Sequence, residues 1–150
     1  MNPRIDRFLA RHRNIGIDTC IFVYWGESNE KYGELVDPIF TWLEGRGRAV
    51  TSTVTMLELL VQPYRLNDVD RVNQLYSLFS TFPNLHWIEP SLDVADRAAH
   101  LRGTLHLKTP DALQAATALA AQATGFISND ASFKRVRDLD VLILDEVLAS

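Results

Sequence analysis

The sequence is short of cysteine, of long apolar runs and of basic charge, and the first two shortages each exclude a class of protein. Its one cysteine, Cys20, leaves no partner for an intramolecular disulfide, and no Cys/His cluster has zinc-finger spacing. No stretch is apolar and long enough for a membrane span, and residues 1–13 are polar and arginine-rich, unlike a signal peptide. We therefore expect a cytoplasmic protein without a membrane segment.

Basic charge is scarce because 15 lysines and arginines face 19 aspartates and glutamates, which gives a formal net charge of -4. Proteins that bind nucleic acids normally present a basic face to the phosphates, so this balance argues against such a partner. The argument fails if several carboxylates bind metal ions, because the cations cancel negative charge where a phosphate approaches. The placement of the acidic residues therefore decides what the net charge means.

The sequence alternates short apolar segments with segments of helical periodicity. No repeat or linker divides it, so we expect residues 1–150 to form a single domain. Strands are predicted at residues 14–18, 48–52, 86–88, 126–128 and 141–144. Helices are predicted at residues 31–44, 54–64, 69–82, 92–105 and 110–124, with a helical turn at 130–133. This order predicts an α/β fold, a three-layer α/β/α sandwich around a parallel sheet of about five strands.

Four acidic residues are predicted at the carboxyl edge of this sheet. Asp18 is expected as the last residue of the first strand, and Asp130 follows the fourth. Glu58 and Asp111 are expected in the first turns of helices that begin at the same edge, the second helix being capped by Thr109. Ligand sites of open parallel sheets lie at this edge, where the strand order reverses. The four acids are therefore expected to converge if the first and fourth strands are neighbours.

Converging carboxylates need compensation, because two charges about 5 Å apart repel by roughly 3 kcal/mol at an effective dielectric constant near 20. Proton sharing, which raises the pKa of one acid, reduces the repulsion. A hard divalent cation such as Mg²⁺ or Mn²⁺, which prefers oxygen ligands, does the same. Such a cation also stabilises charge on a phosphate during in-line displacement, so the pattern indicates phosphodiester hydrolysis.

Four strings of residues carry these acids and resemble, in order, the acidic motifs of the PIN-domain ribonuclease family. They are IGIDTCIFVYW (15–25), TSTVTMLELL (51–60), TPDALQAATAL (109–119) and FISNDASF (126–133), the last two being the most specific. The resemblance covers nearly the whole chain and implies an RNA hydrolase that uses Mg²⁺ or Mn²⁺ and leaves 5′-phosphate and 3′-hydroxyl ends. The metal-binding and catalytic acids that it implies are Asp18, Glu58, Asp111 and Asp130. It also implies supporting hydroxyl groups at Thr19 and Ser128.

Small PIN-domain proteins of this length are similar to VapC-type toxins of toxin–antitoxin systems. This likeness implies an endoribonuclease that acts on RNA, is neutralised by a small antitoxin protein and commonly forms a homodimer. Cys20 departs from the family pattern, which more often has Asn or Ser there, and this affects a hydrogen bond from position 20 rather than the metal acids. We interpret Cys20 as a small buried residue and not a nucleophile, because no histidine lies near it in the motif.

The acids also have other interpretations. Each aspartate alone fits a helix start, but four acids in this order favour a shared site. A PIN fold without nuclease activity, acting as an RNA-binding or protein-interaction module, is the alternative function, and such a protein is expected to lack one or more acids. A response-regulator receiver needs an acceptor aspartate after a middle strand, where this sequence has Glu89 and Pro90. A haloacid-dehalogenase-type phosphatase needs a second aspartate at the position of Cys20.

Two further groups of residues are candidates for contacts with partners. One group is more apolar than a small core needs, and we interpret it as core, with a partner groove as the alternative: Phe22, Tyr24, Trp25, Leu59, Leu60 and Tyr64. The other group consists of basic residues that could contact phosphates near the acids: Arg65, Arg102, Lys108, Lys134 and Arg135. The histidines share no ligand spacing and are interpreted as structural or surface residues.

Overall fold

The computed structural model describes residues 2–150 and has a five-stranded sheet at its centre. The strands are β1 (Ile15–Ile17), β2 (Ala49–Ser52), β3 (Leu85–Ile88), β4 (Gly125–Ser128) and β5 (Asp140–Ile143). Their order in the sheet is β3-β2-β1-β4-β5, and every neighbouring pair is parallel. The predicted parallel sheet of about five strands is confirmed.

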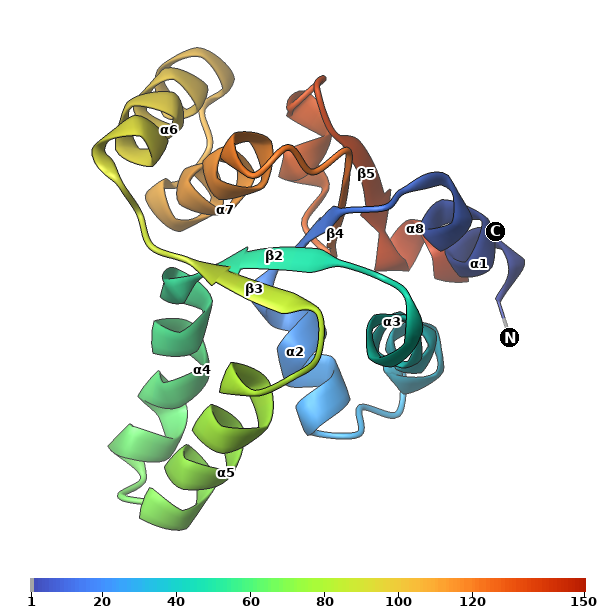
Figure 1. Cartoon of the computed structure of the whole chain (residues 1–150), viewed down its shortest axis with the longest axis vertical. Helices are drawn as coiled ribbons and strands as arrows, with labels where there is room; N and C mark the ends of the chain where they lie inside the picture. The colour runs from blue at the N-terminus through green and yellow to red at the C-terminus, as the bar shows by residue number, and fades with distance from the viewer. Residues whose placement is uncertain (1) are drawn as a thin grey trace.

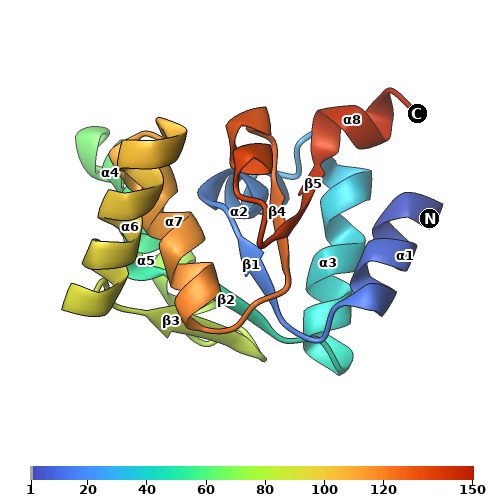
Figure 2. The same ribbon diagram turned by 90° about the horizontal axis from the view of Figure 1, so that it is seen from above.

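Helices cover both faces of the sheet, as Figures 1 and 2 show from two directions. They are α1 (Pro3–Arg11), α2 (Thr19–Gly26), α3 (Gly33–Gly45), α4 (Thr53–Arg65), α5 (Val69–Ser80), α6 (Leu92–Leu105), α7 (Thr109–Ala120) and α8 (Leu144–Leu148), with a 3-10 helix η1 (Ala131–Arg135). Helices α6 and α7 pack on one face, and α1 to α5 with α8 pack on the other. The predicted three-layer α/β/α sandwich is therefore confirmed. Within residues 2–150 no helix is long and apolar enough to cross a membrane.

Alternation along the strands builds the two core layers. Ala49 belongs to the core beneath α1 to α5 and α8, whereas its neighbour Val50 belongs to the core beneath α6 and α7. Ile127 and Phe126 divide in the same way. Because successive side chains of a strand point to opposite faces, a strand covered on both faces is apolar at most of its positions. The continuous apolar runs that predicted the strands follow from this double burial.

Three helices lie outside the predicted elements, namely α1, α2 and α8. Helix α2 (TCIFVYWG) is apolar on all sides, with Ile21 and Phe22 fully buried. A helix of this kind has no amphipathic pattern, and its β-branched and aromatic residues look equally like a buried strand. Helix α1 is joined to the sheet by His12, whose ring nitrogens lie 2.8 Å from Thr124 Oγ1 and 2.7 Å from Asp140 Oδ2. These contacts give His12 the structural role that was predicted.

Two predicted assignments next to the acids were wrong. The first strand ends at Ile17, so Asp18 is not its last residue but the N-cap of α2. Helix α7 begins at Thr109, so Thr109 does not cap it, and the N-cap residue Lys108 makes no side-chain capping hydrogen bond. Both corrections move a boundary by one residue and leave the acids at the same edge.

Two helices and one strand also end earlier than predicted. Helix α7 ends at Ala120 rather than residue 124, because Gln122 adopts the left-handed backbone conformation, with φ 62°. Helix α5 ends at Ser80 rather than residue 82. Strand β5 ends at Ile143 because Leu144 begins α8.

Candidate functional site

The candidate site lies beyond the carboxyl ends of β1 and β4. Strand order reverses here, since β2 and β3 follow on one side of β1 while β4 and β5 lie on the other. In the β1–β4 pair, Ile17 lies opposite Ile127. The backbone N–H of Asp18 donates to the Ile127 carbonyl at 3.0 Å, which continues the pairing by one residue. The first and fourth strands are therefore neighbours, as the predicted convergence requires, and the site has the location expected for a parallel sheet.

Asp18 is the most buried of the four acids, with 9% of its surface exposed. The Ser128 hydroxyl donates to Oδ2 at 2.7 Å, and the Thr19 backbone N–H donates to Oδ1 at 2.9 Å. Burial raises the pKa of Asp18 to about 6 against the lowering effect of these hydrogen bonds, and the charges of Asp111 and Glu58 raise it further. A proton or a cation therefore stabilises this carboxylate more than an exposed one.

Glu58 reaches the site from the second turn of α4 and is exposed. The Thr19 hydroxyl donates to its Oε1 at 2.7 Å. Ser128 also accepts a hydrogen bond from the backbone N–H of Asp130 at 3.0 Å, so it contacts two of the predicted acids. The two hydroxyl residues named from the sequence thus contact acids of the predicted set.

Asp111 and Asp130 lie near enough for the charge of Asp130 to act on Asp111. Burial raises the pKa of Asp111, and the charges of Asp130 and Glu58 raise it further. Hydrogen bonds from the Ser132 hydroxyl and backbone N–H lower the pKa of Asp130, and the N–H bond makes Asp130 the N-cap of η1. Asp130 therefore caps a helix start, as the simpler interpretation has it, and its charge also acts on Asp111.

The four carboxylates influence one another electrostatically, but they do not form a closed cluster. Within residues 2–150 no three His, Cys, Asp or Glu side chains lie close enough to hold one metal ion between them. Like charges repel, and the exposed side chains of Glu58 and Asp130 can stay apart from the buried Asp18. The donors that surround the region are carboxylate oxygens, which are the ligands that Mg²⁺ and Mn²⁺ prefer. The donor chemistry fits a hard divalent cation, which can keep several water ligands when only one or two carboxylates bind it.

A sequence model of the PIN domain matches residues 15–139, a range that contains the four acids and the first four strands. The chain belongs to the PIN-domain family. The family that the four strings predicted is therefore confirmed. None of the curated protein sequences matches this PIN domain significantly.

Solved structures share the fold of this PIN domain. VapBC-1 from nontypeable Haemophilus influenzae is similar with a TM-score of 0.69 and 19% sequence identity, over 88% of this chain and 98% of that chain. VapBC2 from Rickettsia felis, bound to a DNA fragment from its promoter, has a TM-score of 0.66 and 19% sequence identity, over 87% of this chain and 98% of that chain. VapBC-5 from Mycobacterium tuberculosis, a member of a family of toxin–antitoxin systems, has a TM-score of 0.57 and 21% sequence identity, over 88% of this chain and 98% of that chain. At these identities the likeness establishes a common fold.

Two of the five basic residues predicted near the acids act on them. Lys108, at the start of α7, opposes the rise in the pKa of Asp111 and adds to the lowering of the pKa of Asp130. Arg135, at the end of η1, lowers that of Asp130. The PIN domain therefore carries positive charge beside its acidic site despite its negative net charge.

Cys20 lies beside Asp18 but does not have the properties of a nucleophile. Burial raises the pKa of the Cys20 thiol to about 12, and the charge of Asp18 adds to the effect. The thiolate is the reactive form of cysteine, so this thiol stays protonated and unreactive at neutral pH. Cys20 was predicted to be buried; it is partly buried and packs against the core, and the prediction that it is not a nucleophile fits this environment.

Sequence reasoning missed a buried hydrogen-bond network beneath Glu58. Its members, which belong to β2, α4 and α7, are Thr51, Ser52, Thr55 and Gln114. A signal for it exists in the sequence, because Gln114 interrupts the alanine-rich face of DALQAATALA and the three hydroxyl residues occupy one short string, TSTVT. Buried polar groups require hydrogen-bond partners, so the polar residues in these two segments are expected to bond to one another.

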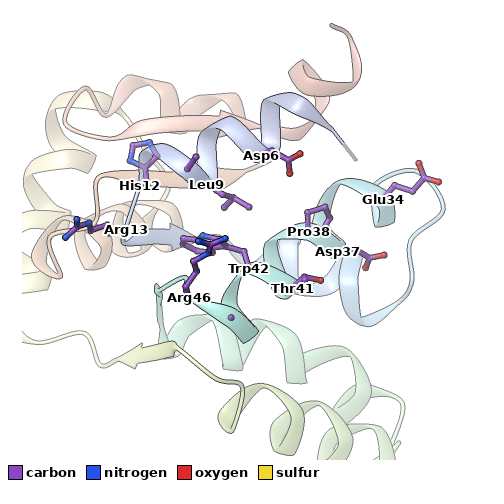
Figure 3. Close-up of a pocket in the computed structure, with 12 residues that line it drawn as sticks. Asp6, Leu9, His12, Arg13, Glu34, Asp37, Pro38, Thr41, Trp42 and Arg46 are labelled. Carbon is purple, nitrogen blue, oxygen red and sulfur yellow. The ribbon is translucent and has the colours of Figure 1, made fainter.

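Two cavities differ in their relation to the acids. One, of about 1280 Å³, lies between α1 and α3 (Figure 3), and its lining includes none of the four acids. Its acidic residues, at one end, are Asp6, Glu34 and Asp37, and its basic residues, at the other, are Arg13 and Arg46. Helix dipoles alone favour this arrangement, because acidic residues stabilise helix N-termini and basic residues stabilise C-termini. A smaller cavity, of about 310 Å³, is lined by α2, α4 and α5 and includes Glu58. Only the smaller of these two cavities adjoins the candidate site.

Proposed function

We propose that this PIN domain is a divalent-metal-dependent endoribonuclease and the toxin of a toxin–antitoxin pair. The observation that carries the proposal is the buried carboxylate of Asp18, whose pKa is raised to about 6 by burial and by the nearby charges of Asp111 and Glu58. Membership in the PIN-domain family supports it, as do the names of the structural neighbours. We further propose that residues 1–150 act as one domain in the cytoplasm, with Mg²⁺ or Mn²⁺ as cofactor.

In the proposed reaction the four acids, Asp18, Glu58, Asp111 and Asp130, hold the cation. When bound, Mg²⁺ or Mn²⁺ supplies Lewis-acid chemistry that neutralises charge on the scissile phosphate during in-line attack by water. Ser128 and Thr19 fix the orientation of the carboxylates through the hydrogen bonds described above. Lys108 and Arg135 lie where they can contact neighbouring RNA phosphates, which compensates for the negative net charge.

Cleavage of end-labelled single-stranded and structured RNAs tests this function. We expect cuts with Mg²⁺ or Mn²⁺ and none in excess chelator, with 5′-phosphate and 3′-hydroxyl ends on the products. An Asp18→Asn protein purified in the same way controls for contaminating nucleases. Cleavage that persists in chelator, or products ending in a 2′,3′-cyclic phosphate, would contradict a metal-dependent mechanism.

The alternative function is a PIN fold that binds RNA or protein without cutting RNA. The retention of all four acids weighs against it, since a binding module has no need of a carboxylate whose burial raises its pKa. Metal-independent RNA binding that is equal in wild type and Asp18→Asn, without cleavage by either, would favour this alternative.

We propose two protein partners, a second copy of this chain and a small antitoxin protein. Of the apolar residues singled out in the sequence, Phe22 and Leu59 are buried, and three others pack against the core, but Tyr64 is 61% exposed. Further exposed apolar side chains accompany it on α4, on α5 and between them: Leu57, Leu66, Val69 and Tyr76. Helices α4 and α5 pack against each other, and exposed apolar groups that gather on a protein surface usually mark partner contacts. We therefore propose that the homodimer contact lies on this α4–α5 surface.

The dimer contact is testable by substitution on the α4–α5 surface. We expect wild type to have the mass of a homodimer in light scattering and the Tyr64→Ser, Leu66→Ser double variant to have that of a monomer, because it loses apolar contact area. Leu92→Ser is the matched control, since Leu92 is 90% exposed on α6. Equal masses for the double variant and the control would show that the α4–α5 surface is not the contact.

A further inference from the structure

A buried amide lies beneath the candidate site and contacts the hydroxyl group that holds Glu58. Gln114 projects from α7 and is only 2% exposed. Its Nε2 lies 2.6 Å from Thr55 Oγ1 and 3.5 Å from Thr19 Oγ1. Its Oε1 lies 3.4 Å from the backbone N of Ser52, an N–H donor, and this contact fixes the amide with its nitrogen toward the hydroxyls.

Each threonine hydroxyl has one hydrogen, and this limits which residue donates in each hydrogen bond of the network. A hydroxyl has one hydrogen to give, and Thr51 donates its own to the Ile17 carbonyl at 3.0 Å. Thr55 must therefore donate to Thr51, 2.7 Å away, and accept from Gln114. Gln114 is therefore the first donor in a series of hydrogen bonds that runs through Thr55 and Thr51 and ends at the Ile17 carbonyl of β1.

The same count applies on the side of the acidic site. The Thr19 hydroxyl oxygen lies 2.7 Å from Glu58 Oε1 and 3.4 Å from Thr55 Oγ1. Its single hydrogen goes to the nearer, charged acceptor, Glu58, so its oxygen is free to accept from the second N–H of Gln114. Both amide hydrogens are then used, one toward each threonine. Gln114 favours the rotamer and the hydroxyl orientation in which Thr19 donates to Glu58.

We propose that Gln114 is a positioning residue of the metal site, acting on Glu58 through the Thr19 hydroxyl. The inference rests on the proposed function, because it assigns Gln114 to the support of a metal-binding carboxylate. Hydrogen-bond partners behind a ligand fix its orientation, and their loss typically costs 10–100-fold in metal affinity or activity. An amide suits this place because it donates twice without adding charge next to carboxylates.

The test is the affinity for Mn²⁺, measured by titration calorimetry on folded protein, together with thermal melting of the metal-free protein. Gln114→Met keeps the length of the side chain and removes both donors, and we expect it to weaken Mn²⁺ binding by about tenfold. Thr117→Val is the matched control, since Thr117 is a buried polar residue on the same helix whose hydroxyl has no partner within residues 2–150. The control is expected to bind Mn²⁺ like wild type. If Gln114→Met does not fold, Gln114→Asn takes its place. It retains an amide but is too short to reach Thr19, so we expect it to weaken Mn²⁺ binding as well.

A double-mutant cycle separates positioning from a general effect on packing. If Gln114 acts through Thr19, Gln114→Met weakens Mn²⁺ binding in wild type but has little further effect in Thr19→Val, whereas Thr19→Ser retains nearly full affinity. An equal loss in both backgrounds, or no loss from Gln114→Met, overturns the inference while leaving the proposed function intact. Failure of wild type itself to bind Mn²⁺ overturns the proposed function and this inference with it.

Discussion

Asp18→Asn is expected to reduce metal-dependent RNA cleavage at least about a thousandfold, equivalent to roughly 4 kcal/mol of lost transition-state stabilisation. The substitution removes the most buried carboxylate of the site and its negative charge, while asparagine retains the shape and can still accept from Thr19 and pair with Ser128. The protein should therefore fold normally and lose activity through the metal. Rates under single-turnover conditions, with Mn²⁺ varied at each RNA concentration, measure the loss.

A matched pair of aspartates distinguishes a metal site from helix capping. Asp111 and Asp93 both lie in the first turn of a helix, α7 and α6, but Asp111 is near enough to Asp130 and Glu58 for their charges to raise its pKa. If first-turn aspartates served only the helix dipole, Asp111→Asn and Asp93→Asn would have the same small effect. We expect Asp111→Asn to abolish cleavage and Asp93→Asn to leave it unchanged. Equal activity of these two variants would remove Asp111 from the site.

The sequence was sufficient to predict the layers and the edge on which the acids lie. Strands buried on both faces are mostly apolar, so β1 and β4 were visible as short apolar runs, each followed closely by an aspartate. Their pairing was only a condition of the prediction, because strand order depends on packing between distant segments. The register that places Ile17 opposite Ile127 supplies that missing information.

Other features could not be predicted because they depend on the tertiary environment. Helix α2 is apolar on every side, so its helical form follows from burial between the sheet and its neighbouring helices rather than from periodicity. The raised pKa of Asp18 needs both its burial and the positions of Glu58 and Asp111. The role of Gln114 likewise depends on three segments that meet only in the folded chain.

In the absence of metal, Asp18→Asn is expected to be more stable than wild type at pH 7. Burial raises the pKa of Asp18 from 3.8 to about 6, so between these values the folded protein holds a proton that the unfolded chain has lost. Stability from this group is therefore greatest at low pH and falls as the pH rises through that window, by up to about 3 kcal/mol. Asparagine lacks this cost. We expect a net gain of about 1–2 kcal/mol at pH 7, since some hydrogen-bond energy of the carboxylate is lost.

Melting curves of both proteins in chelator, at pH 4 and at pH 7, measure this gain, which corresponds to roughly 2–4 °C for each kcal/mol. The advantage of the variant should appear at pH 7 and largely vanish at pH 4, where wild-type Asp18 is protonated in the folded state. Saturating Mn²⁺ should reverse the order at pH 7, because a ligand that binds only the folded wild type stabilises it alone. A variant that melts well below wild type at pH 7 in chelator would instead show that ionised Asp18 holds the fold together. This reversal of the order of stability on adding Mn²⁺ would show that ionised Asp18 destabilises the metal-free fold and serves metal binding instead.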